Sequence, residues 1–101
     1  MTVNIYLHAP NNPHQLVDRN ENGLEAALDD VRQHWNEEPS VSQLFWFTDE
    51  HETLLATMHR HPTDSERAIT VYADGRVEQH QCEYLLDSEG HYEATEVRKI
   101  A

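Results

Sequence analysis

The chain contains little cysteine, which cross-links small proteins, and little glycine, which makes a backbone flexible. Its single cysteine, Cys82, excludes an intramolecular disulfide and fits a reducing compartment such as the cytoplasm. Its three glycines are spread along the chain and form no glycine-rich phosphate-binding loop. No apolar run approaches the length of a membrane helix, so we expect no membrane span. These absences favour a chain that folds around an ordinary hydrophobic core.

Positive charge is also scarce. Seven Lys and Arg residues stand against 19 Asp and Glu residues, which gives a formal net charge of −12. Such a field repels nucleic acid and anionic membranes and attracts basic protein surfaces. Three explanations stay open: an acidic surface that favours solubility, complementarity to a basic partner that itself binds nucleic acid, and adaptation to high salt.

The most apolar stretch is residues 43–48, which read Gln-Leu-Phe-Trp-Phe-Thr and hold three of the eight aromatic residues. Side chains alternate between the two faces of a strand, so this segment is apolar on both faces. A strand of that kind is usually central and covered on both sides. The 101 residues are therefore predicted to form one domain, residues 1–101, organised around this strand.

One helix is predicted over about residues 22–37. Its apolar residues recur at the spacing of a single stripe and are Leu24, Ala27, Leu28, Val31 and Trp35. Asn22 is expected to cap the helix, with Glu25 completing a capping box. Glu25 and Asp29 are like charges one helical turn apart, which costs a few tenths of a kcal/mol in an isolated helix.

The other predicted strands show alternating apolar and polar residues or lie next to turn signals. They cover residues 2–8, 53–60, 67–72, 77–86 and 91–100. Residues 9–14, with two prolines and two asparagines, are expected to form a loop. In the turn at Asp74-Gly75, a left-handed Gly75 would place Val71 opposite Val77. In the last strand the alternation slips between Ala94 and Val97.

The predicted fold class is α+β, an antiparallel sheet of five to six strands with one amphipathic helix packed on one face. The order is one strand, the helix, and then five strands. One helix cannot cover both faces of such a sheet, so some aromatic residues are expected on a partly exposed face. The candidates are Tyr6, Phe45, Phe47, Tyr72 and Tyr84. Such a face would bind a partner or form a homodimer, unless the sheet curls and buries it.

Histidine is abundant, with eight residues. His59 and His61 would share one strand face, and His51 and His80 would lie on neighbouring strands in one arrangement of the sheet. A zinc or copper site needs a third and a fourth ligand, which this pattern does not supply. We therefore predict no metal, no cofactor and no enzymatic activity, with a His-based metal-binding protein or enzyme as an alternative.

In size and charge the chain resembles small acidic inhibitors, namely toxin immunity proteins, anti-restriction proteins and anti-CRISPR proteins. The resemblance covers no motif and carries over no residue. It implies a nucleic-acid mimic that docks on the basic surface of a nucleic-acid-handling protein, without binding nucleic acid or membrane itself. The expected partner-binding residues are Glu21, Glu25, Asp29, Asp30, Glu37 and Glu38, with Phe45 and Phe47 as aromatic anchors. A homo-oligomeric structural protein is the other alternative.

Overall fold

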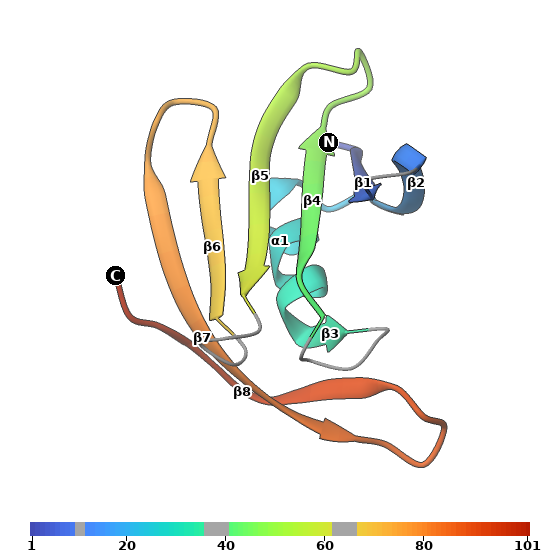
Figure 1. Cartoon of the computed structure of the whole chain (residues 1–101). Helices are drawn as coiled ribbons and strands as arrows, with labels where there is room; N and C mark the ends of the chain where they lie inside the picture. The colour runs from blue at the N-terminus through green and yellow to red at the C-terminus, as the bar shows by residue number, and fades with distance from the viewer. Residues whose placement is uncertain (10–11, 36–40, 62–66) are drawn as a thin grey trace.

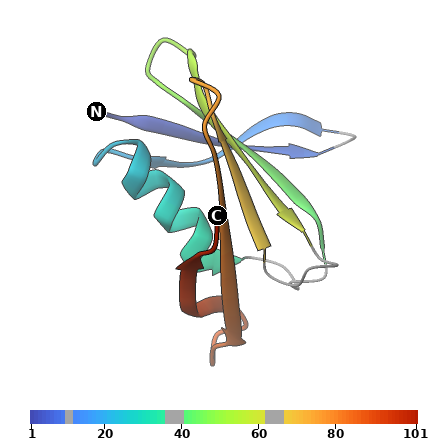
Figure 2. The same cartoon turned by 90° about the vertical axis from the view of Figure 1, so that its left-hand side faces the viewer.

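A single curved sheet wraps around one helix. The computed structural model describes residues 1–9, 12–35, 41–61 and 67–101. Its elements in chain order are β1 (Val3–Ala9), β2 (Asn12–Asn20), α1 (Leu24–Gln33), β3 (His34–Trp35), β4 (Gln43–Thr48), β5 (Leu54–His61), β6 (Arg67–Tyr72), β7 (Val77–Leu86) and β8 (Tyr92–Lys99). The antiparallel sheet has eight strands in the order β2-β1-β4-β5-β6-β7-β8-β3. Figure 1 shows α1 behind β4 and β5, and Figure 2 shows the sheet curving around it.

The α+β class and the antiparallel sheet are confirmed. The predicted count of five to six strands is wrong, and so is the predicted order of one strand, the helix and five strands, because one further strand stands on each side of α1 in the chain. The first missed strand is β2, which holds part of the expected loop at residues 12–14. It is an edge strand, and edge strands tolerate a proline such as Pro13. The second is β3, whose two residues are too short to leave an alternating pattern.

The helix is shorter than predicted. It ends at Gln33, and His34 is already extended, with φ −124° and ψ 139°. His34 and Trp35 pair instead with Glu93 and Tyr92 of β8. Gly23 precedes the helix and no side chain caps it, so the expected capping box is wrong. Residues 36 and 37 of the predicted helix lie outside the described residues.

The hydrophobic core lies on the concave face of the sheet, beneath α1. From the sheet it contains Val3, Ile5, Phe47, Ala56, Met58, Ala68, Tyr72 and Cys82, and from the helix Ala27, Leu28 and Val31. β4 occupies an interior position, as predicted, but α1 covers only its concave face. The expectation that β4 is covered on both sides is therefore not met within the described chain.

Trp35 is buried in a cluster of aromatic side chains around the guanidinium group of Arg60. The guanidinium carbon of Arg60 lies 4.3 Å from the Trp35 ring centroid, and Arg60 Nη2 donates a hydrogen bond to the Tyr84 hydroxyl at 3.0 Å. Arg60 is 1% exposed, and burial lowers the pKa of its guanidinium. The Tyr84 hydroxyl donates in turn to the backbone carbonyl of Arg32 at 2.6 Å, which ties the end of α1 to β7. The faces of aromatic rings stabilise this buried charge.

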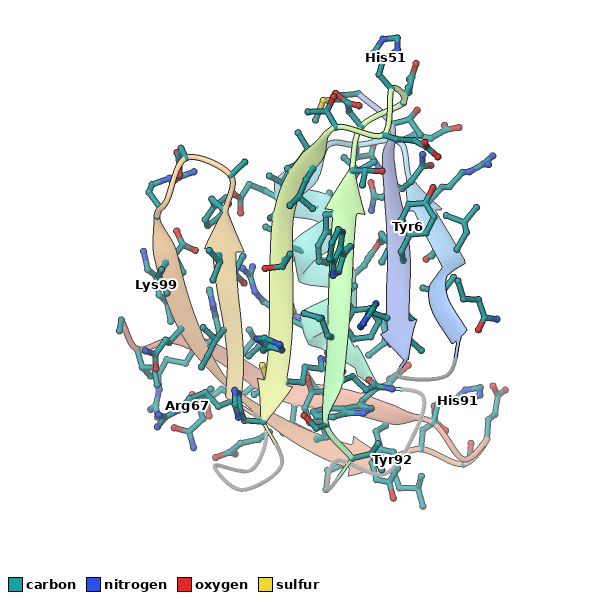
Figure 3. The ribbon with its side chains drawn as sticks, turned by 45° about the horizontal axis from the view of Figure 1, so that its top comes forward. Tyr6, His51, Arg67, His91, Tyr92 and Lys99 are labelled. Atoms are coloured by element: carbon teal, nitrogen blue, oxygen red, sulfur yellow. The ribbon has the colours of Figure 1, made fainter. Side chains whose placement is uncertain are left out.

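The convex face of the sheet has no helix over it in the described part of the chain. We call it the open face. Over β1, β4, β5, β6 and the first half of β7, strand register assigns to it Asn4, Tyr6, His8, Leu44, Trp46, Thr48, Thr57, His59, His61, Arg67, Ile69, Val71, Val77, Gln79 and Gln81. The same register continues this face with Leu16 and Arg19 on β2 and with Glu83, Glu96 and Arg98 on β7 and β8. Figure 3 looks onto this face, with Tyr6 on β1. Of the five aromatic candidates only Tyr6 belongs to it. Phe45, Phe47, Tyr72 and Tyr84 all point to the concave side, where they are buried or half-buried.

The predicted register of the β6–β7 hairpin and the predicted slip in the last strand are both confirmed. Gly75 has φ +95° and Val71 pairs with Val77. The slipped alternation in β8 corresponds to a register shift, because Glu83 pairs with Glu96 whereas Tyr84 pairs with Ala94. Thr95 is the extra residue, and a bulge of this kind bends and twists the strand pair.

Replacing Gly75 tests this turn. We expect Gly75→Val to lower the free energy of unfolding by more than about 1 kcal/mol, since a β-branched residue is strained at positive φ. An added Cβ would meet no atom within 4 Å, so the loss comes from the backbone alone. Gly75→Asn is the matched control and should cost less, because asparagine tolerates this region. Denaturant melts that rank the two variants equally would contradict the turn geometry.

Candidate protein-docking surface

The exposed side of α1 carries carboxylates on two flanks. Glu25 and Asp29 lie one turn apart on the side of the helix that faces β6 and β7. Glu25 contacts Tyr72 of β6, and Asp29 contacts Arg32 of the helix itself. Asp30 lies about 100° further around the helix and faces β2, where it accepts a hydrogen bond from the Asn20 side-chain amide at 2.6 Å. The helix therefore presents negative charge toward both halves of the sheet.

On the first flank, Tyr72 and Arg32 connect the helix to the sheet. The Tyr72 hydroxyl lies 2.9 Å from a Glu25 oxygen and 3.2 Å from a Glu78 oxygen. Burial and the two carboxylates raise the pKa of Tyr72 to about 12. Arg32 is 2% exposed, and its guanidinium contacts Asp29 at 3.2 Å and the Thr70 hydroxyl at 3.2 Å. The repulsion expected between Glu25 and Asp29 is therefore offset, because each carboxylate has its own partner.

Glu78 of β7 adds a third carboxylate to this flank, from the side of the sheet. Arg32 lies 4.0 Å from one of its oxygens, and Lys99 lies 3.6 Å from the other. Burial alone would raise the pKa of Glu78, but the hydrogen bond from Tyr72 and the charges of Lys99 and Arg32 outweigh it and lower that pKa. Glu78 therefore stays ionised, and the flank keeps its negative charge.

On the second flank, α1, β1, β2 and β4 enclose a cleft of about 500 Å³. The cleft has apolar walls and a polar rim. The apolar lining residues are Ile5, Leu7, Val17, Val31 and Phe45, and the polar ones are Gln15, Asp18, Asp30, His34 and Gln43. The pairing of Ile5 with Asp18 places both side chains on the concave side of the sheet. Two carboxylates thus flank an apolar depression.

Gln43 adds a polar group to the same cleft. Its side-chain oxygen Oε1 is buried and accepts no hydrogen bond from any described residue. A buried carbonyl oxygen without a donor carries a free-energy cost of about 1–3 kcal/mol. The apolar walls, with Asp18 and Asp30 at the rim, make the cleft suited to a cationic group on an aliphatic stem.

The structure separates the predicted partner-binding residues into three sets. Glu21, Glu25, Asp29 and Asp30 are exposed on or just before α1. Glu37 and Glu38 lie outside the described residues. Of the two phenylalanines, Phe45 lines the cleft, whereas Phe47 is fully buried in the core and cannot contact a partner. The assignment of both to an exposed face is therefore corrected.

Of the polar residues that line the cleft, sequence reasoning missed Gln15, Asp18, His34 and Gln43, of which Gln15 lies on β2 like Asp18. Asp18 was missed together with β2, and His34 was placed inside the predicted helix. Gln43 is the first residue of the predicted central strand, and its alternation with Leu44 already indicated a side chain on the face of Phe45.

The described histidines are spread over the turns and both faces of the sheet. The rings of His59 and His61 lie 5.9 Å apart on the open face, which confirms that they share a strand face. His51 lies in the turn between β4 and β5, and His80 is buried on the concave side of β7, so the two are not neighbours. Within the described residues, no three His, Cys, Asp or Glu side chains come together as metal ligands. The described chain also contains no helix with the length and apolar character needed to cross a membrane.

Comparison of the chain with protein-family models, with curated proteins and with solved structures found no match.

The buried His80 predicts a pH-dependent stability. Burial, with Arg32 nearby, lowers the pKa of His80 below its ordinary 6.5, against the opposing influence of Glu78 and Asp29. The unfolded chain then takes up a proton more readily than the folded one, so acid favours unfolding. We expect the free energy of unfolding to fall as the pH drops through 6.5, and to level off below the folded-state pKa.

Two variants separate the contribution of His80 to the pH dependence of stability from that of an exposed histidine. His80→Gln should flatten the pH dependence of stability between about pH 7.5 and pH 5.5. His59→Gln, on the open face, leaves the buried imidazole in place and should keep the wild-type slope. Denaturant melts across this range measure the effect, and an unchanged slope in His80→Gln would contradict it.

Proposed function

We propose that this chain is a small acidic binding protein of the cytoplasm, without enzymatic activity, that inhibits a nucleic-acid-handling protein. It docks on the partner's basic surface and keeps nucleic acid away from it. This is the mode of action of a nucleic-acid mimic, as in inhibitors of the immunity, anti-restriction or anti-CRISPR type.

The observation that carries the proposal is the cleft beside α1. An arginine or lysine side chain consists of an aliphatic stem and a cationic head. The apolar walls around Val31 and Phe45 fit such a stem, while Asp18 and Asp30 at the rim fit the head. Basic side chains of this kind are abundant on proteins that bind nucleic acid.

The charge of the whole chain supports the same partner class. A net charge of −12 attracts a basic surface over long range and speeds the encounter. Two of the seven cations, Arg32 and Arg60, are buried at 2% and 1% exposure. Their guanidinium groups therefore cannot meet a nucleic-acid phosphate at the surface, and direct binding of nucleic acid is disfavoured.

The test is a charge reversal at the cleft rim. A partner is first captured from host lysate treated with nuclease, and its association rate is then measured at low and high salt. We expect Asp18→Lys combined with Asp30→Lys to slow association at least about 10-fold at low salt. The wild-type rate should fall as salt screens the charges. Both residues are exposed, so the fold should survive, which circular dichroism checks.

The matched control is Glu50→Lys combined with Glu89→Lys. These exposed residues lie in the β4–β5 and β7–β8 turns, away from the cleft, and the variant has the same net charge. Its association rate should stay within about threefold of the wild type. If the captured partner associates at the same rate with the cleft variant and at every salt concentration, the docking proposal fails.

A further inference from the structure

The β4–β5 turn holds one glutamate in an unusual backbone conformation. Glu52 has φ +62°, and it is the one non-glycine residue with a positive φ in the described chain. Hydrogen bonds fix the turn around it. The Asp49 side chain accepts from the backbone N–H groups of His51 at 2.8 Å and Thr53 at 3.0 Å, and the Asp49 carbonyl accepts from the Glu52 N–H at 3.1 Å. Glycine or asparagine would fit this position with less strain, so the turn alone does not explain a glutamate there.

A shallow hollow of about 300 Å³ lies on the open face next to this turn. It is lined by Tyr6, Trp46, Thr48 and Glu52. Tyr6 pairs with Trp46 across β1 and β4, and Thr48 follows on the same face of β4, toward the turn. The two aromatic residues therefore lie at one end of the hollow and Glu52 at the other. Figure 3 shows Tyr6 on β1, with the turn that carries His51 beyond the end of β4.

The chemistry of this lining suits a cation. The Glu52 carboxylate forms no hydrogen bond or ion pair with another residue within the described ranges, so its charge is not offset. A cation close to a carboxylate and to aromatic rings is attracted by both. The backbone hydrogen bond from Thr53 lowers the pKa of Asp49, which keeps a second negative charge in the same turn. The net charge of −12 disfavours an anion here.

A guanidinium group fits this lining better than an ammonium group. It is planar, packs against aromatic rings, and presents two N–H groups side by side to a carboxylate. The molecule already stabilises its own guanidinium groups on rings elsewhere. The guanidinium carbon of Arg60 lies 4.3 Å from the Trp35 ring centroid, and that of Arg76 lies 4.2 Å from the Tyr72 ring centroid.

We propose that this hollow is a binding site for the guanidinium group of an arginine side chain on a protein partner. The rings of Tyr6 and Trp46 pack against the guanidinium plane, and the Glu52 carboxylate accepts hydrogen bonds from its N–H groups. The left-handed backbone at Glu52 serves this contact, in keeping with the tendency of strained residues to lie at binding sites. The hollow lies on the opposite face of the sheet from the cleft beside α1, so either site can be disproved without the other.

The test titrates the labelled protein with a tripeptide that has a central arginine and neutral, blocked ends. The chain has two tryptophans, so its ¹H–¹⁵N spectrum contains two indole signals, and Trp46→Phe assigns them. The Trp46 signal should shift saturably, with a dissociation constant of order millimolar. The signal of Trp35, which is buried in the core, should not move. Salt at about 0.15 M screens the general field of the protein.

Two further peptides test the chemistry of the occupant. Citrulline has nearly the shape of arginine without its charge, and a peptide with central citrulline should bind at least about fivefold more weakly. A peptide with central lysine should also bind more weakly, because an ammonium group lacks the planar pair of donors. Citrulline binding equal to arginine binding would overturn the cation site, and equal binding of lysine would overturn the choice of a guanidinium.

Two variants of the turn test the role of the carboxylate. Glu52→Gln should weaken arginine binding at least about fivefold. Glu50→Gln is the matched control, since this exposed residue of the same turn does not line the hollow, and its binding should stay within about twofold of the wild type. Glu52→Gly should weaken binding equally while the protein unfolds at a higher denaturant concentration, because glycine adopts positive φ without strain.

Three results would contradict the site. The first is a Trp46 signal that does not shift with the arginine peptide up to tens of millimolar. The second is equal weakening by Glu52→Gln and Glu50→Gln, which would mean that only the general charge of the turn acts. The third is a folded Glu52→Gly variant that binds the arginine peptide as well as the wild type.

Discussion

The fold depends on one constraint, which is that a single ten-residue helix has to bury one face of an eight-stranded sheet. A flat sheet of this width would leave most of its concave side exposed. Curvature solves the problem, because it brings β1 and β7 toward opposite flanks of the same helix (Figure 2). Register shifts occur in the β1–β2, β4–β5 and β7–β8 pairs, and such irregularities bend and twist a strand pair. The same curvature opens the cleft between α1 and β2.

The curved sheet also encloses two charged side chains, Arg60 and Arg32. Trp35 follows the helix directly and lies under Arg60, whose guanidinium has no hydrogen-bond partner for Nε and Nη1 among the described residues. Such a group costs several kcal/mol to bury, and here aromatic faces and the Tyr84 hydroxyl stabilise it in place of a carboxylate. Arg32 is buried in a similar way but retains Asp29 and Glu78 as partners. Both arginines connect the end of the helix to the sheet.

Features that a few neighbouring residues determine were predicted correctly, and features that depend on pairing with distant strands were not. The strand at residues 43–48 and the turn at Gly75 were predicted correctly, because alternation and turn chemistry are determined over a few residues. β3 and the early end of α1 were not, because pairing with β8 overrides the helical pattern that continues through His34 and Trp35. The exposed carboxylates of α1 were found from the sequence. The cleft was not, since Asp18 and Asp30 are brought together only by the pairing of β2 with β1.

The two faces of the sheet differ in what covers them and in where charge lies. Carboxylates gather around α1, the cleft, the turns and β8, whereas the described residues of β1, β4, β5, β6 and the first half of β7 place none on the open face. On the concave side, the carboxylates of the helix stand beside the apolar walls of the cleft. The net charge of −12 therefore draws a basic partner toward a molecule whose acidic helix also offers an apolar depression to the stems of its side chains.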